Sequence, residues 1–156
     1  MWTDAKPAAL MPLVVADIFE LAGRFRENGE AIARTVGQTQ ARWQVMSVAS
    51  AGRRTVPQIA RRLGVSRQNV QRIADLLVGE DWATFEPNPD HRGSPYLILS
   101  THGHSALARL TKAAGAYHRQ LARDLAGADI TAIHRGLRRL LDATAHSTGR
   151  KPKPKE

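Results

Sequence analysis

Residues 58–77, QIARRLGVSRQNVQRIADLL, carry the pattern that most restricts how this chain can fold. Gly64 separates two short amphipathic segments, and glycine readily takes the positive φ angle that a tight turn after a helix requires. Ala60 precedes that glycine by four residues, and Val70 follows it by six. A small residue, a glycine and an aliphatic residue at these offsets are typical of a helix-turn-helix, in which two short helices pack across one turn.

The starts of both helices are also marked. Residues 55–58, TVPQ, form a capping box with proline in the first turn, which predicts a short helix ending at Gly64. Ser66 is a favourable N-cap for the second helix, which we expect to extend to about Gly79.

The second helix leaves its outward face to side chains that can read bases. Arginine can donate two hydrogen bonds to guanine, and glutamine or asparagine can pair with the edge of adenine. A helix that is only solvated would normally mix in Glu and Lys, but no acid occurs here before Asp75. The predicted DNA-binding residues of this helix are Ser66, Arg67, Gln68, Asn69, Gln71 and Arg72.

Charge is unevenly distributed along the chain. Twenty-three Lys and Arg against 14 Asp and Glu give a formal net charge of +9, which suits a polyanionic partner such as nucleic acid. No acid lies between Glu30 and Asp75. The arginines in this interval are Arg34, Arg42, Arg53, Arg54, Arg61, Arg62, Arg67 and Arg72. We expect a polyanion-binding surface here, with phosphate contacts from Arg53, Arg54 and Thr55.

The remaining helical segments are long. Apolar residues recur at intervals of three and four over residues 12–36, 101–126 and 129–146, and residues 38–51 predict a further helix. The aliphatic stripes of the terminal helices exceed what 156 residues can bury within one chain.

Two short β-like runs interrupt the helices. Residues 82–86 and 96–99 flank a nine-residue segment, 87–95, that is dense in turn-forming residues. We expect a hairpin that packs on the helices through Trp82, Phe85, Leu97 and Leu99 and presents His91, Arg92 and Gly93 at its tip. The expected fold is thus mostly α with one small β-hairpin.

Several classes of protein are disfavoured. The chain has no cysteine, which excludes disulfides, thiolate zinc sites and thiol redox sensing. The six histidines form no i,i+4 pair, and no nucleophile motif or phosphate loop is found, so we expect no metal, cofactor or catalysis. No apolar run reaches the roughly 18 residues of a membrane span. The first residues, MWTDAKPAALMPLVV, do not resemble a secretory signal, and we expect a cytoplasmic protein without membrane contact.

From Gln38 to Gly103 the chain resembles the MarR family of winged helix-turn-helix transcriptional regulators. The matching segments are 55–78, TVPQIARRLGVSRQNVQRIADLLV, and 82–103, WATFEPNPDHRGSPYLILSTHG. In that family an Asp-x-Arg sequence closes the wing, and a Leu-Ser or Leu-Thr pair starts the next helix. The flanking helices agree in number and place, so the resemblance covers roughly residues 12–146.

The resemblance implies a homodimer whose terminal helices pair across a two-fold axis and present two lobes to a pseudo-palindromic DNA operator. The second helix of the helix-turn-helix would enter the major groove. Arg92 would reach the adjacent minor groove, where narrow grooves favour arginine, with Asp90 holding its guanidinium and His91 touching phosphate. The family usually represses transcription, and many members bind a small aromatic or anionic effector between lobe and terminal helices.

The resemblance also sets the expected organisation. The expected chain comprises an N-terminal dimerisation helix (1–37), a winged helix-turn-helix lobe (38–100), C-terminal dimerisation helices (101–146) and a disordered basic tail (147–156). One departure lies after the recognition helix, where Asp81-Trp82 replace the usual glycine and aliphatic residue. Because aspartate takes the left-handed conformation less readily than glycine, we expect the turn to be centred on Gly79.

Two other functions are compatible with parts of the sequence. A basic architectural protein would bind nucleic acid through the same charge without reading bases. A metal-dependent sensor would require some of the scattered histidines to meet in space.

Overall fold

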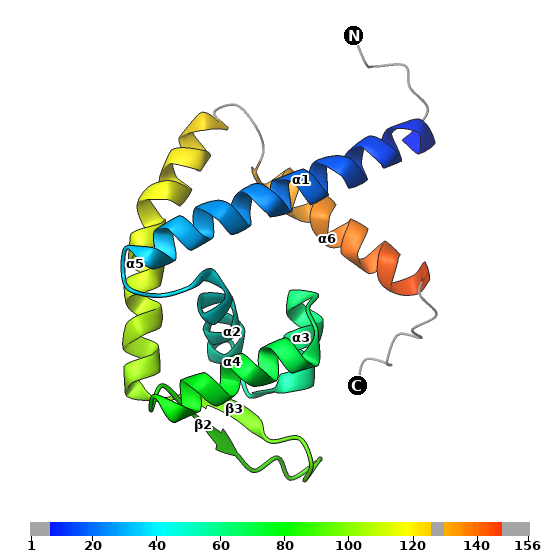
Figure 1. The fold of residues 1–156 in the computed structure, drawn as a ribbon. Helices are drawn as coiled ribbons and strands as arrows, with labels where there is room; N and C mark the ends of the chain where they lie inside the picture. The colour runs from blue at the N-terminus through cyan, green and yellow to red at the C-terminus, as the bar shows by residue number, and fades with distance from the viewer. Residues whose placement is uncertain (1–6, 126–129, 148–156) are drawn as a thin grey trace. The chain divides into compact units, whose positions relative to one another are not determined.

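The computed structural model describes residues 7–125 and 130–147 of the 156-residue chain, and Figure 1 shows the arrangement. Within these residues there are six helices and three short strands. They are α1 (Pro7–Arg34), α2 (Gln40–Ser50), β1 (Arg54–Thr55), α3 (Val56–Leu63), α4 (Arg67–Gly79), β2 (Ala83–Glu86), β3 (Tyr96–Leu99), α5 (Thr101–Asp124) and α6 (Ile130–Ser147). The mostly helical fold with a small hairpin is therefore confirmed. Apart from Ser147, which ends α6, the expected basic tail lies outside the described residues.

The chain divides into two compact units, Met1–Gly115 and Ala116–Glu156. The first contains α1 to α4, the three strands and the first part of α5; the second contains the rest of α5 and α6. The winged lobe, residues 38–100, lies wholly within the first unit.

The strands form one antiparallel sheet in the order β1-β3-β2. Leu97 of β3 lies opposite Arg54 on one side and Phe85 on the other. The hairpin of β2 and β3 agrees with the sequence prediction, whereas β1 was not predicted. A two-residue strand is too short to show an alternating pattern, and it forms only because β3 comes alongside it.

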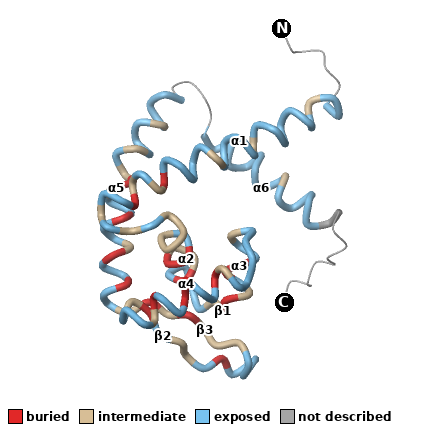
Figure 2. Tube along the Cα trace, in the orientation of Figure 1, coloured by how far each residue is buried: buried red, intermediate tan, exposed pale blue. Residues whose placement is uncertain are grey.

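One apolar core holds the winged lobe together. Figure 2 shows the buried positions gathered on α2, α3, α4 and β3. Met46, Ile59, Leu77 and Leu97 are each 0% exposed, and Trp82 and Phe85 pack partly buried against them. The hairpin thus packs on the helices as the sequence predicts, and this packing sets the direction in which its loop projects.

The turn after α4 corrects one expectation. Gly79 is the last residue of α4, and Asp81 instead takes the left-handed conformation, with a φ of 60°. The Trp82 N–H donates to the Leu77 carbonyl at 2.8 Å, the long bond of a Schellman helix end. Aspartate is among the non-glycine residues that visit this region, and the surrounding bonds hold it there.

The start of α5 secures this turn. The Ser100 hydroxyl donates to the Asp81 carbonyl at 2.7 Å, and the Ser100 N–H donates to the Trp82 carbonyl at 3.0 Å. A Cβ atom built on Gly103 would lie 2.1 Å from the Trp82 oxygen, so only glycine permits this approach. The end of α4, the start of β2 and the start of α5 are therefore joined at one place.

The terminal helices are largely exposed in the single chain, as Figure 2 shows. On α1 the exposed large apolar side chains are Met11, Leu13, Val14, Val15, Phe19, Leu21 and Phe25, and on α6 they are Ile130, Ile133, Leu137 and Leu141. Their exposed fractions range from 38% to 75%. The excess of unburied aliphatic surface that the sequence predicts is therefore present.

Candidate nucleic-acid interface

Helix α4 has two opposite faces. Val70, Ile73 and Leu77 are buried against the core of the lobe, whereas Arg67 and Gln71 are exposed. Ser66 caps the helix: its hydroxyl accepts a hydrogen bond from the Asn69 N–H at 3.2 Å. The exposed face also carries Gln68 and Arg72, with Asn69 half-buried beside them. Five of the six residues predicted for this helix thus lie on it, and the sixth, Ser66, fixes where it begins.

Hydrogen bonds within this face orient some of its side chains. The Gln71 Nε2 donates to the Asp75 Oδ1 at 2.8 Å, and the Arg72 Nη2 donates to the Asn69 Oδ1 at 3.2 Å. Within the described ranges, Arg67 and Gln68 make no side-chain hydrogen bond. The first turn of α4 therefore presents a guanidinium and an amide that are open to a ligand.

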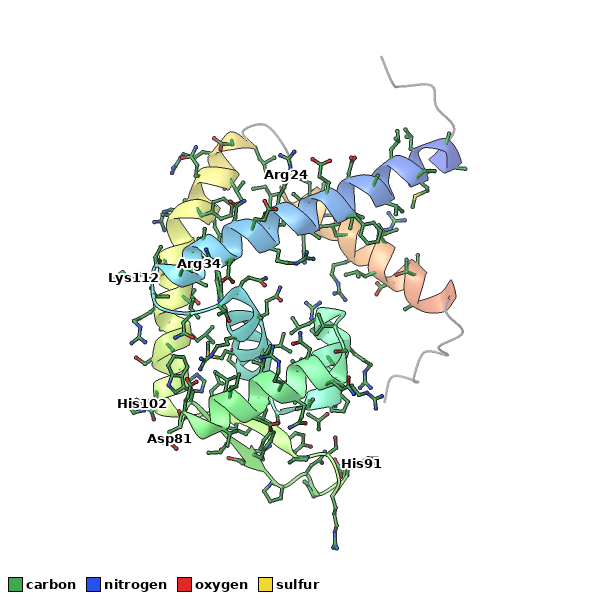
Figure 3. The ribbon with its side chains drawn as sticks, in the orientation of Figure 1. Arg24, Arg34, Asp81, His91, His102 and Lys112 are labelled. Carbon is green, nitrogen blue, oxygen red and sulfur yellow. The ribbon has the colours of Figure 1, made fainter. Side chains whose placement is uncertain are left out.

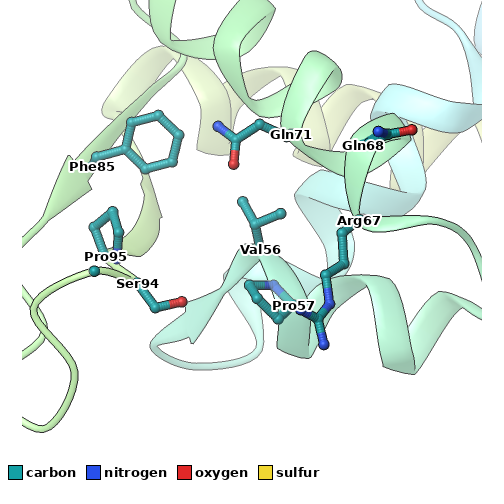
Figure 4. A pocket seen from close by; sticks show the side chains of 9 residues that line it. Val56, Pro57, Arg67, Gln68, Gln71, Phe85, Ser94 and Pro95 are labelled. Carbon is teal, nitrogen blue, oxygen red and sulfur yellow. The ribbon is translucent and has the colours of Figure 1, made fainter.

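Two hollows separate α4 from the hairpin. Figure 4 shows the first, of about 400 Å³, between the start of α3, the exposed face of α4 and the base of the hairpin. Its lining is Val56, Pro57, Arg67, Gln68, Gln71, Phe85, Gly93, Ser94 and Pro95. The second, of about 520 Å³, is lined by Thr55, Pro57, Gln58, Arg61, Arg67, Asn88, His91, Gly93 and Ser94. Arg67 borders both hollows.

Arg61 is a site residue that the sequence analysis did not single out. It lies exposed on α3 and lines the second hollow together with Arg67 and His91. These three side chains come from α3, α4 and the hairpin loop, and together they favour an anion such as a phosphate. The sequence feature that could have identified Arg61 is its position among the arginines between Glu30 and Asp75.

The hairpin loop is shaped by a buried asparagine that the sequence analysis also missed. Asn88 is 7% exposed; its Nδ2 donates to the Ser94 carbonyl at 3.1 Å, and its Oδ1 accepts from the Asp90 N–H at 3.1 Å. An asparagine between two prolines is a turn signal of this kind. The loop therefore has a defined shape, with His91 at its far end in Figure 3 and Arg92 exposed next to it.

The expected ion pair in this loop is absent. Asp90 and Arg92, both described and both exposed, form no salt bridge with one another. An ion pair between exposed side chains is worth only about 0–1 kcal/mol in water, which is too little to order two side chains of a free loop.

The phosphate contacts expected before α3 are only partly open. Arg53 pairs with Glu86, Nη2 to Oε2 at 2.7 Å, and its guanidinium lies 4.9 Å from the centre of the Tyr96 ring. Arg54 is half-buried on β1. Thr55 is 5% exposed and forms the capping box of α3, its N–H donating to the Gln58 Oε1 at 2.9 Å. Thr55 borders the second hollow, but its side chain is already engaged in the capping box.

Arg42, another arginine of the acid-free interval, is even less available to a phosphate. Both of its terminal nitrogens bond to the carboxylate of Glu80, and its guanidinium lies 4.8 Å from the centre of the Trp82 ring. Its side chain is only 18% exposed. The interval without acids in the sequence is therefore not free of acids in space, because Glu80 and Glu86 come from beyond it.

Two further observations concern metal sites and membrane spans. Among the described residues, no group of three or more His, Asp or Glu side chains is placed to hold a metal ion. No helix in the described ranges has the length and apolar character needed to cross a bilayer.

Comparisons with known proteins agree with this geometry. A family model described as "MarR family" matches residues 36–92. An uncharacterized protein of Mycobacterium tuberculosis is 48% identical over 130 residues, covering 83% of this chain and 91% of its own length. The repressor CouR bound to a 23-mer DNA duplex is 25% identical, with 94% and 99% coverage and a TM-score of 0.62. A mutant of MarR from E. coli complexed with operator DNA matches in fold, at 18% identity, 88% and 99% coverage and a TM-score of 0.70.

Proposed function

The chain belongs to the MarR family of winged helix-turn-helix transcriptional regulators, a non-enzymatic family, and from this premise we propose that it is a homodimeric repressor binding a pseudo-palindromic DNA operator. The observation that carries the proposal is the exposed face of α4. It brings Arg67, Gln68, Gln71 and Arg72 together on a helix whose opposite face is buried. The major groove of B-DNA admits one α-helix and displays a different donor and acceptor pattern for each base pair.

Recognition of bases is assigned to α4. Its N-terminal turn enters the major groove, so that Arg67 and Gln68, whose side chains form no hydrogen bond within the described structure, contact base edges. Gln71 and Arg72 follow one turn further along, and Asn69 lies in the first turn, where its Oδ1 accepts from Arg72. Ser66 sets the start of the helix and brings the N–H groups of its first turn toward the backbone of the DNA.

Contacts with the DNA backbone and the minor groove are assigned to residues of α3 and of the hairpin loop. Arg61 and His91 border the second hollow beside Arg67 and supply positive charge or hydrogen-bond donors to a phosphate. Arg92, exposed on the hairpin loop, enters the adjacent minor groove, where a narrow groove concentrates negative potential. Arg53 and Arg54 would contact phosphate only at the edge of this surface, and Asp90 would order Arg92 only once DNA is bound.

Dimerisation is assigned to α1 and α6. Both expose rows of aliphatic side chains that water disfavours and that a second copy would cover. Two lobes related by a two-fold axis would then meet half-sites about one helical turn, roughly 34–36 Å, apart. A dimer occupying an operator in the cytoplasm represses transcription by excluding other proteins from that DNA.

We include no small-molecule effector in this function. The hollow of about 550 Å³ beside α1 and α2 is lined by Arg26, Arg34, Glu27 and Glu30, whose charges cancel. Its other lining residues, Ala31, Gln40 and Ala41, offer no aromatic surface. Nothing in it favours the aromatic or anionic ligand that the family resemblance suggests.

The test is selection of a binding site from a random pool of duplexes, followed by competition. Binding to the selected site should persist in a large excess of random duplex, whereas a basic architectural protein would be displaced. Arg67→Ala should weaken binding to the selected site by about 1–3 kcal/mol and relax its base preference. Arg24→Ala removes the same charge from α1, where Arg24 pairs with Glu20, and should leave base preference unchanged. Equal losses on selected and random DNA in Arg67→Ala would contradict sequence-specific reading.

A further inference from the structure

We propose that Asp75 determines which base Gln71 reads, by fixing the orientation of the Gln71 amide group. The inference rests on the proposed DNA-reading function of α4. It concerns the selectivity of one side chain in that helix.

The geometry consists of one hydrogen bond on the exposed face of α4. The Gln71 Nε2 donates to the Asp75 Oδ1 at 2.8 Å, across one turn of the helix. Both side chains are exposed, so neither is needed for the core. An ionised carboxylate only accepts hydrogen bonds, so it attracts the nitrogen of the amide and repels its oxygen. Asp75 therefore favours one of the two amide orientations.

The surroundings of Gln71 do not compete with this bond. Gln71 lines the first hollow beside Val56 and Phe85, whose side chains carry no hydrogen-bonding group. The polar lining residues Arg67, Gln68 and Ser94 form no side-chain hydrogen bond with it within the described structure. Figure 4 shows the Gln71 amide at this hollow, with its oxygen on the side of Val56. Within the described structure, Asp75 is the side chain that bonds to Gln71.

The fixed orientation has a consequence for base reading. After one N–H is donated to Asp75, Gln71 still has its oxygen and its second N–H, which match the N6 donor and the N7 acceptor of adenine. Guanine presents two acceptors at those positions, O6 and N7, and its O6 would face the amide oxygen of Gln71. An unrestrained amide could turn its nitrogen toward O6 and donate one hydrogen bond to it, but this rotation would break the bond to Asp75. Asp75 thus adds a repulsive element against guanine to the attraction for adenine.

A purely structural role would look different. An (i, i+4) pair of this kind stabilises a helix only slightly and leaves base preference unchanged. Loss of the Asp75 charge would strengthen binding to all sequences by a similar factor, because DNA is negatively charged everywhere. The ratio of affinities for two operators that differ at one base pair cancels this common effect. That ratio is therefore the informative measurement.

The experiment uses the full chain and operators selected from a random duplex pool. Gln71→Ala first identifies the base pair at which Gln71 acts, as the position whose preference it removes. At that pair the wild-type chain should prefer adenine to guanine by about fivefold or more. In Asp75→Ala and Asp75→Asn the preference should fall to about twofold or less. An alanine cannot hold the Gln71 amide in either orientation, and an asparagine amide can equally well accept from its nitrogen or donate to its oxygen. Asp75→Glu retains an acceptor-only carboxylate and should keep most of the preference.

Each outcome has a definite reading. An unchanged ratio in Asp75→Ala and Asp75→Asn overturns the inference and leaves the proposed function intact. Equal relaxation in Asp75→Glu also overturns it, because an acceptor at this place would then not be what matters. The same applies if Gln71→Ala alters no position in the selected site. A wild-type chain that selects no sequence at all overturns the proposed function, and this inference with it.

Discussion

The winged lobe and the terminal helices place their apolar side chains in opposite environments. In the lobe, Ile59, Leu77 and Leu97 are completely buried, and the exposed face of α4 is polar. On α1 and α6 the exposed positions include rows of aliphatic and aromatic side chains, up to 75% exposed at Phe19. The helices of both regions show ordinary helical periodicity, so the difference lies in what covers their apolar faces. The lobe completes its core within one chain, whereas the apolar rows of the terminal helices stay exposed in the single chain, and the proposed dimer would cover them.

The largest effect is expected in the lobe. Leu77→Ala should lower the free energy of unfolding by about 2–5 kcal/mol, because it removes a side chain that is 0% exposed and leaves a cavity between α4 and the sheet. Denaturant unfolding at two protein concentrations measures this loss. The same loss at both concentrations is expected, and a loss that depended on concentration would mean that the lobe also relies on the partner chain.

The next effect is expected on α6. Leu137→Asp places a charge in the middle of the exposed apolar row and should weaken dimerisation by about 2–3 kcal/mol, roughly 30- to 150-fold in the dissociation constant. Sedimentation or light scattering over a range of concentrations measures the change.

Thr131→Asp is the matched control for Leu137→Asp. It introduces the same charge on α6 outside the row of Ile133, Leu137 and Leu141, and it should leave the dimer intact. If the wild-type chain were monomeric at micromolar concentration, the proposal that a second chain covers the apolar rows of the terminal helices would be wrong.

The smallest effect is expected at the hairpin tip. Arg92 is exposed and has no salt bridge within the described residues, so Arg92→Ala should change the free energy of unfolding by less than about 0.5 kcal/mol. Operator affinity should fall by about 1 kcal/mol or somewhat more, and minor-groove protection beside each half-site should disappear. Thermal unfolding and footprinting together separate the two effects. A persistent footprint with unchanged affinity would show that the wing does not meet the minor groove.

Local signals in the sequence were sufficient for most of the fold. Residues 55–58 predicted the capping box that starts α3, and Ser66 predicted the N-cap of α4; both are observed. Gly64 has the positive φ that the turn was expected to need, at 67°. These features involve residues that are close in the chain, so their physics can be read from a short window.

Interactions between distant residues were not predictable in the same way. The strand β1 exists because β3 pairs with it, and Asp81 takes the left-handed conformation where Ser100 and Trp82 bond around it. Neither follows from the local sequence. The intrinsic preference of glycine for the left-handed conformation predicted a turn at Gly79, but hydrogen bonds formed in the folded structure place that conformation at Asp81.

The sequence by itself determined the helix-turn-helix, the hairpin and the side chains that face outward from α4, because periodicity, capping and turn preferences act over a few residues. Only the tertiary structure decided which arginines are available to DNA. Arg42 and Arg53 look the same in the sequence as Arg61 and Arg67, yet Glu80 and Glu86 pair with the first two. Those partners lie 38 and 33 residues away along the chain. A charge interaction depends on distance in space, and folding alone brings such groups together.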